Sequence, residues 1–173
     1  MKSLYSIVIA LVAVIVSAAV AGADPGKTWE KQINTPVRFK VLKQFGNAAV
    51  LDQETGRVWE QSPSTSTSTW FNALNHCDDL DLGGRKGWRL PTIEELESLA
   101  NTANSSPALP TGHPFTLTSG QKTGFYWSAT THAFLTSEAL GEILTNGNVS
   151  SNGKNQDDFV WCVRGGQGID GVQ

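Results

Sequence analysis

The sequence predicts an α+β domain, in which two helices pack on small antiparallel sheets with long irregular loops. Two segments, residues 69–82 and 92–100, carry apolar residues at helical spacing. Several shorter segments alternate apolar and polar residues, which is typical of strands with one buried face. Turn signals that contain glycine, at 53–56 and 146–147, lie between neighbouring strand segments and indicate hairpins.

The first 23 residues have the pattern of a cleavable signal peptide. Lys2 gives a short basic start, and an almost unbroken apolar stretch covers residues 4–20. Small residues then precede Asp24, so we expect cleavage after Ala23, with cleavage after Ala21 as the alternative. An uncleaved membrane anchor is a further alternative, because about 17 apolar residues is the lower limit for spanning a bilayer.

Beyond the leader the chain is expected to form one domain. Residues 24–36 are polar and aperiodic and predict an N-terminal arm, residues 37–166 the domain, and residues 167–173 a C-terminal tail. A chain of this size buries about two thirds of its surface, so no second domain is needed. The sequence holds 16 acidic and 13 basic side chains, a net charge of −3. This acidic balance argues against a nucleic-acid partner, for which a basic patch is expected.

Strands are expected on both sides of the two helices. Three precede the helices, over residues 37–42, 48–52 and 57–61, and the last two flank the turn at 53–56. The other strands are expected over residues 126–130, 138–145, 148–150 and 159–164.

The first helix is predicted over residues 69–82, with Cys77 on its apolar face and Gly83-Gly84 at its end. The second begins at Thr92, which caps it, and Glu95 completes a capping box. We interpret Glu94 and Glu95 as charges that favour the helix start rather than as catalytic carboxylates.

Cys77 and Cys162 are the two cysteines of the chain. An even count in an oxidising compartment predicts a disulfide between them. The closed loop of about 85 residues would remove denatured-state entropy worth roughly 4 kcal/mol at most. Two free buried thiols are the alternative. A zinc site is less favoured, because two distant cysteines lack the paired spacing of zinc ligands.

Several motifs of the chain are those of a known family. They are Thr69-Trp70, Leu82-Gly83-Gly84, Gly87-Trp88-Arg89-Leu90-Pro91-Thr92, Tyr126-Trp127-Ser128-Ala129-Thr130, Asn146-Gly147 and Cys162-Val163-Arg164. With these motifs the sequence resembles the Lcl C-terminal domain family over most of its length. The resemblance implies a C-type-lectin-like fold, in which a disulfide commonly joins the first helix to the last strand. It also implies a bacterial surface or secreted protein, and the collagen-like adhesin that gave the family its name binds sulfated glycans.

A ligand surface is expected on the irregular segments 102–124 and 145–158, because long loops of compact domains often bind. The candidate ligand-binding residues are Asn146, Asn148, Asn155, Asp157 and Asp158. The calcium-binding and sugar-binding tripeptides of calcium-dependent lectins are absent from the sequence. The stretch 155–158 could supply about half of the six to eight oxygens that calcium needs, so we favour a solvated acidic turn over calcium.

Basic and aromatic residues lead to two further expectations. The basic residues near the N-terminus, Lys27, Lys31, Arg38, Lys40 and Lys43, could form a local basic face for a sulfated glycan, although a solubilising strand face is favoured. Four tryptophans, Trp70, Trp88, Trp127 and Trp161, are predicted to lie in the core. Trp29 and Trp59 are predicted to be freer.

No enzyme active site emerges from the sequence, and we expect no catalytic activity. His76, His113 and His132 lack metal-ligand spacing, and His76 is expected at the surface. The formylglycine-generating enzymes share a related fold, but their chemistry needs a cysteine pair in a substrate groove.

The sequence therefore favours an exported binding or adhesion module, in the periplasm, at the cell surface or in the medium. Its ligand would be a glycan or a surface protein, and no resident cofactor is expected. A structural component of an envelope or extracellular assembly is the alternative.

Overall fold

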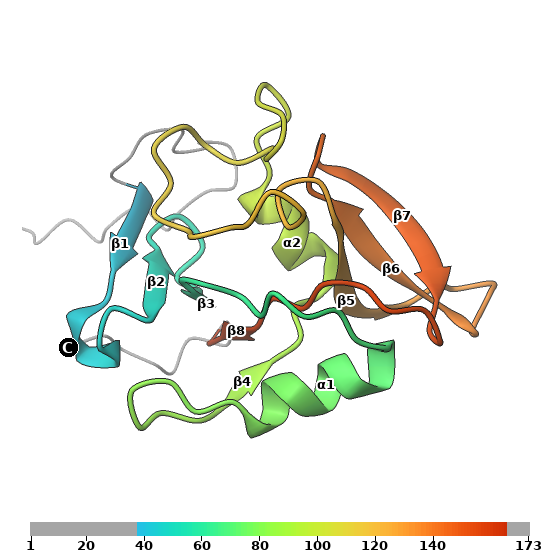
Figure 1. The fold of residues 1–173 in the computed structure, drawn as a ribbon, viewed down its shortest axis with the longest axis horizontal. Helices are drawn as coiled ribbons and strands as arrows, with labels where there is room; N and C mark the ends of the chain where they lie inside the picture. The colour runs from blue at the N-terminus through green and yellow to red at the C-terminus, as the bar shows by residue number, and fades with distance from the viewer. Residues whose placement is uncertain (1–37, 166–173) are drawn as a thin grey trace, which may run out of the picture. The chain divides into compact units, whose positions relative to one another are not determined.

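The computed structural model describes residues 38–165 (Figure 1). The predicted signal peptide, arm and C-terminal tail lie outside these residues, as do Lys27, Trp29 and Lys31. The described elements are β1 (Phe39–Val41), the 3-10 helix η2 (Lys43–Phe45), β2 (Ala49–Asp52), β3 (Val58–Glu60), α1 (Trp70–Asp79), β4 (Trp88–Arg89), α2 (Ile93–Leu99), β5 (Phe125–Thr131), β6 (Glu138–Ile143), β7 (Asn148–Gly153) and β8 (Val163–Arg164). In the described part of the chain, no helix has the length and apolar character needed to cross a bilayer.

The strands form two antiparallel sheets. One has five strands in the order β1-β2-β3-β8-β4, and the other is the meander β5-β6-β7. Helix α2 lies between the two sheets, and α1 lies beside β4 (Figure 1). The α+β class with two helices and small antiparallel sheets is thus confirmed, while the C-type-lectin-like fold stays a prediction.

The predicted last strand is only partly right, because the chain changes sheets within it. At its start, the amide of Phe159 donates to the carbonyl of Phe125 in β5 (3.0 Å). Three residues later, the carbonyl of Cys162 accepts from the amide of Glu60 in β3 (3.2 Å). Regular pairing is therefore confined to β8, and residues 159–164 connect the two sheets.

The tryptophans fill two clusters of buried side chains. Trp70, Trp88 and Trp127 belong to one, with the two cysteines, and Trp161 belongs to the other. These four core predictions are confirmed. The prediction for Trp59 is wrong, since it is completely buried and packs edge-to-face on Trp161 with ring centroids 5.8 Å apart. The reason is its place in β3, the central strand of the five-stranded sheet.

Helix α1 ends earlier than predicted. It stops at Asp79, and Leu80 is already extended with φ −64° and ψ 131°. Two acidic residues at 78 and 79 face the negative end of the helix dipole, which disfavours a further turn. Gly83 instead adopts φ +61° in the turn that follows, where a Cβ atom would lie 2.7 Å from the Cα of Phe45.

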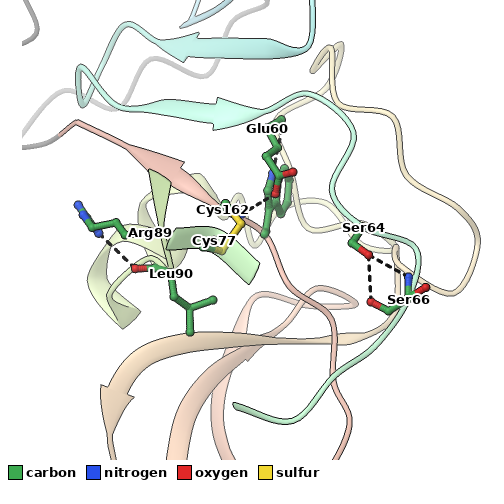
Figure 2. The surroundings of a disulfide bond; sticks show 8 residues. Glu60, Ser64, Ser66, Cys77, Arg89, Leu90 and Cys162 are labelled. Carbon is green, nitrogen blue, oxygen red and sulfur yellow. Dashed lines mark hydrogen bonds between the residues drawn. A yellow bond between two sulfur atoms is a disulfide. The ribbon is translucent and has the colours of Figure 1, made fainter. Parts of the chain in front are cut away.

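The disulfide between Cys77 and Cys162 is confirmed. It joins α1 to the segment just before β8, with Cα atoms 5.4 Å apart, and both cysteines are completely buried (Figure 2). It therefore fixes the first helix to the segment that connects the two sheets.

Arg38 does not belong to a solvated basic face, unlike the exposed Lys40 and Lys43. Its side chain is completely buried and donates two hydrogen bonds to the carboxylate of Asp52, at 2.9 and 2.8 Å. Glu54 lies 3.1 Å from the guanidinium, and the carbonyl of Ser98 accepts a further bond. This part of the predicted basic face is therefore wrong, because two acidic residues at the β2–β3 turn compensate the charge of Arg38.

Helix α2 has the predicted capping box, and Glu95 of this box also binds two arginines. The amide of Glu95 donates to the Thr92 hydroxyl, and the amide of Thr92 donates to the Glu95 carboxylate (2.9 Å). That carboxylate also accepts from Arg57 at 2.5 Å and from Arg89 at 2.6 and 2.7 Å. Burial alone would raise the pKa of Glu95, but the hydrogen bonds from Arg89, Arg57 and Thr92 and the charge of Arg89 lower it to about 2.

We predict that Glu95→Gln destabilises the domain by about 3 kcal/mol at neutral pH, because it leaves two arginines without their buried partner. The pKa of Glu95 in the folded state lies below its ordinary value of 4.5, so the stabilisation is complete above about pH 4.5 and is lost as the pH falls toward 2. Denaturant unfolding across this pH range measures the effect. The matched control is Glu94→Gln, an exposed neighbour in the same helix turn. Equal losses in the two variants would contradict the role of the ion pairs.

Candidate functional site

The five predicted ligand-binding residues lie at the two ends of β7 and do not form one site. Asn146 and Asn148 are exposed at the β6–β7 turn, where a Cβ atom added to Gly147 would lie 3.2 to 3.5 Å from side-chain atoms of Ala100, Thr102 and Ala108. At the opposite end of the strand, Asn155 and Asp157 are exposed and Asp158 is half-buried. The expected single surface over segments 102–124 and 145–158 is therefore divided, and the binding roles of these residues stay predictions.

The second group adjoins the start of α1. Ser68 and Asp158 exchange two backbone hydrogen bonds, at 2.9 and 3.1 Å. Next to them, the amide of Trp70 donates to the carbonyl of Lys154 (3.1 Å). Residues 154–158 are thus held against the first turn of the helix.

Lys154 joins this loop to the turn between β5 and β6. Its ammonium group donates to the Thr131 hydroxyl (2.9 Å) and to the Thr136 carbonyl (3.0 Å). The same group lies 4.2 Å from the ring centroid of Trp70, a cation–π distance. We call the surface made by residues 70–71, 132–137 and 154–158 the Lys154 surface.

Three of the four large exposed apolar side chains among residues 38–165 belong to the Lys154 surface. Phe71 is 64% exposed, and its ring lies 5.2 Å from that of Trp70. Phe134 is 93% exposed and Leu135 is 50% exposed. The amides of both residues donate to Nδ1 of His132, at 3.3 and 3.1 Å. This ring nitrogen holds the turn in a shape that presents both apolar side chains to solvent.

Hydrogen bonding also fixes the acidic side of the surface. The Asn152 amide donates to the Asp158 carboxylate at 2.7 Å. Burial raises the pKa of Asp158, the bond from Asn152 opposes that rise, and the charge of Asp157 adds to it. In the described residues, no three His, Cys, Asp or Glu ligand atoms meet at this loop. Calcium binding here stays a hypothesis.

Tyr126 and Glu142 are among the buried residues whose polar atoms have no hydrogen-bond partner in the described structure. Tyr126 and Glu142 are register partners across β5 and β6, and the hydroxyl and both carboxylate oxygens are unpaired. They line a cavity of about 10 Å³, near the size of one water molecule, with Leu96, Leu99, Leu144 and Trp161. Burial and, secondarily, the charge of Glu97 raise the pKa of Glu142 to about 8.

A second buried carboxyl lies beside the disulfide. Glu60 is 5% exposed, and one of its oxygens accepts from the Cys162 amide at 2.7 Å (Figure 2). Burial raises the pKa of Glu60 to about 7, and the bond from Cys162 only partly opposes this. His76 is exposed on α1, as predicted.

Sequence reasoning missed Phe71, Phe134 and Lys154. Phe71 carried a signal, since it interrupts the apolar spacing of Trp70, Ala73 and Cys77 and so had to point away from the core. Phe134 lies in the connection between two strands, where a large apolar residue has no packing role. Lys154 carried no signal, because its contacts come from segments distant in sequence.

The chain was compared with known protein families. The model of the family described as Lcl C-terminal domain matches residues 48–164. This range includes both cysteines and the whole Lys154 surface. No curated protein matches the chain.

Because the carboxyl of Glu142 is unpaired and buried, we predict that the free energy of unfolding falls as the pH rises. The group ionises near pH 4.5 in the unfolded chain and near pH 8 in the folded one, so stability is lost between these values. Glu142→Gln should remove this loss, at about 1.4 kcal/mol per pKa unit. The variant should be more stable than the parent at pH 9 and show no such gain at pH 4.5.

Chemical denaturation at the two pH values tests this expectation. Asp81→Asn, an exposed acid, is the control and should follow the parent chain at both. If Glu142→Gln and the parent lose stability in parallel, the carboxyl is not the cause.

Proposed function

Because the chain belongs to the Lcl C-terminal domain family, we propose that it is an exported module that binds a glycan through the Lys154 surface. The observation that carries this proposal is the exposed ring of Phe71 beside a loop with exposed amide and carboxylate groups. An aromatic face can pack on the apolar face of a sugar ring. The side chains of Asn155 and Asp157 can pair with sugar hydroxyls as donors and acceptors.

The rigidity of this surface supports a binding role. Lys154 is held by a threonine hydroxyl, a carbonyl and an indole ring, and Asp158 is held by Ser68 and Asn152. A surface that is ordered before binding loses less conformational entropy when the ligand arrives. This favours recognition by a fixed surface over a loop that closes on its ligand.

Export is supported by the signal-peptide pattern and by the buried disulfide. Disulfides form and persist in oxidising compartments such as the periplasm and the cell exterior. While it is intact, the same bond argues against an enzyme of the formylglycine-generating type, because the two cysteine sulfurs are bonded to each other. We propose no catalytic activity for the chain.

A second function, assembly through protein contacts, is favoured by Phe134 and Leu135. These two exposed apolar side chains lie at the tip of a fixed turn, and such side chains often fill a pocket on a protein partner. Such a partner would depend on this tip more than on Phe71 and Asn155. Single substitutions can therefore distinguish the two functions.

Glycan-array binding by the purified chain, with calcium and with a chelator, tests the leading proposal. We expect saturable binding to one sugar class. Phe71→Ala and Asn155→Ala should each weaken it by about 10-fold, equivalent to roughly 1.4 kcal/mol. The matched control is Asn148→Ala, which removes the same exposed side chain from the other end of β7.

The outcomes separate the two functions. Loss of binding in Asn148→Ala and not in Asn155→Ala would move the site to the β6–β7 turn. If no glycan binds, and if Phe134→Ser and Leu135→Ser abolish capture of a protein partner, the assembly role replaces the glycan role. A change on chelation would show that a cation takes part.

A further inference from the structure

The disulfide lies within a group of metal-ligating side chains. The sulfur of Cys162, a ring nitrogen of His76 and a carboxylate oxygen of Glu60 lie within 4.8 Å of one another. The sulfur of Cys77 is bonded to that of Cys162 and so adjoins the same group. Among residues 38–165 no other group of three or more His, Cys, Asp or Glu side chains has this geometry.

Three elements bring these side chains together. His76 and Cys77 are neighbours on α1, Glu60 ends β3, and Cys162 precedes β8. The Cys162 amide holds one oxygen of the Glu60 carboxylate at 2.7 Å, and Figure 2 shows this side chain extending toward the disulfide. The exposed position of His76 gives the otherwise buried group access to solvent.

We propose that reduction of the disulfide converts this group into a tetrahedral site for a zinc-type divalent cation, with Cys77, Cys162, His76 and Glu60 as ligands. Two molecules of a low-molecular-weight thiol supply two electrons and two protons to the disulfide, and they leave joined as their own disulfide. The cation then binds both cysteine sulfurs as thiolates, and the two thiol protons pass to solvent. Disulfide and bound cation are thus alternative states of the same two cysteines.

The geometry requires only a small rearrangement. Zinc binds sulfur at about 2.3 Å and histidine nitrogen at about 2.0 Å, so ligand atoms in a tetrahedral site lie roughly 3.3 to 3.8 Å apart. The ligand atoms of Glu60, His76 and Cys162 are up to 4.8 Å apart, so the longest of these distances must shorten by about 1 Å. Breaking the sulfur–sulfur bond releases the two cysteine side chains for this movement. Thiolate ligands favour zinc over calcium, so this site is independent of any calcium at residues 155–158.

Cobalt titration of the full chain tests the proposal. The protein is reduced with a phosphine without oxygen, and Co²⁺ serves as the probe because tetrahedral thiolate coordination gives intense visible bands and a thiolate-to-metal band. We expect one equivalent to bind the reduced protein, Zn²⁺ to displace it, and the oxidised protein to show neither band. His76→Ala should weaken binding by at least about 10-fold, since even outer-shell changes cost 10- to 100-fold.

The controls distinguish this site from binding to a loosened chain. Asn75→Ala removes an exposed side chain next to His76 on the same helix and should bind the metal as the parent does. Glu60→Gln, shown to be folded when oxidised by its near-ultraviolet circular dichroism, should also bind more weakly. If the reduced parent gives no thiolate band, or if His76→Ala binds as tightly as the parent, the proposal is overturned. If the reduced parent unfolds and metal does not restore its circular dichroism, it is overturned as well.

Discussion

The segment from Asp158 to Arg164 is the constraint on which the rest of the domain depends. It pairs first with Ser68 before α1, then with β5 and then with β3, and its Cys162 also carries the disulfide to α1. Trp161 and Cys162 project from consecutive positions into the two different core clusters. Each sheet, the first helix and both clusters therefore take their position from one short extended stretch.

The domain deals with buried carboxylates in two ways. Asp52 and Glu95 each pair with an arginine, and hydrogen bonds satisfy both oxygens of each carboxylate. Glu60 has a single backbone donor and Glu142 has none among the described residues, so both are held in surroundings that favour the neutral acid. The paired acids stabilise elements around β2 and α2, whereas the other two lie near the disulfide and the cavity.

The sequence predicted the local elements well and the long-range contacts poorly. The capping box of α2, the hairpin turns and the four core tryptophans depend on spacing within a few residues, and all are confirmed. Trp59 and Arg38 were misjudged because their surroundings come from strand order and from a turn acid, which no local pattern reveals. The last strand was too long because alternation indicates an extended chain but not which sheet it pairs with. For the same reason, the predicted ligand residues were divided between two ends of one strand. The cluster of Glu60 and His76 at the disulfide could not be found from sequence spacing either.

The disulfide also determines how the domain would respond to mechanical tension. A force that pulls the two chain ends apart passes from Cys77 directly to Cys162 and bypasses the residues between them. The whole three-stranded sheet, α2 and the loop that carries Lys154 lie inside this bypassed loop. Under such a load β1, β2 and β3 can be extended, while the loop at 154–158 carries no load along its backbone. A module that holds onto a surface would then keep this part of its contact face folded while the chain around it stretches.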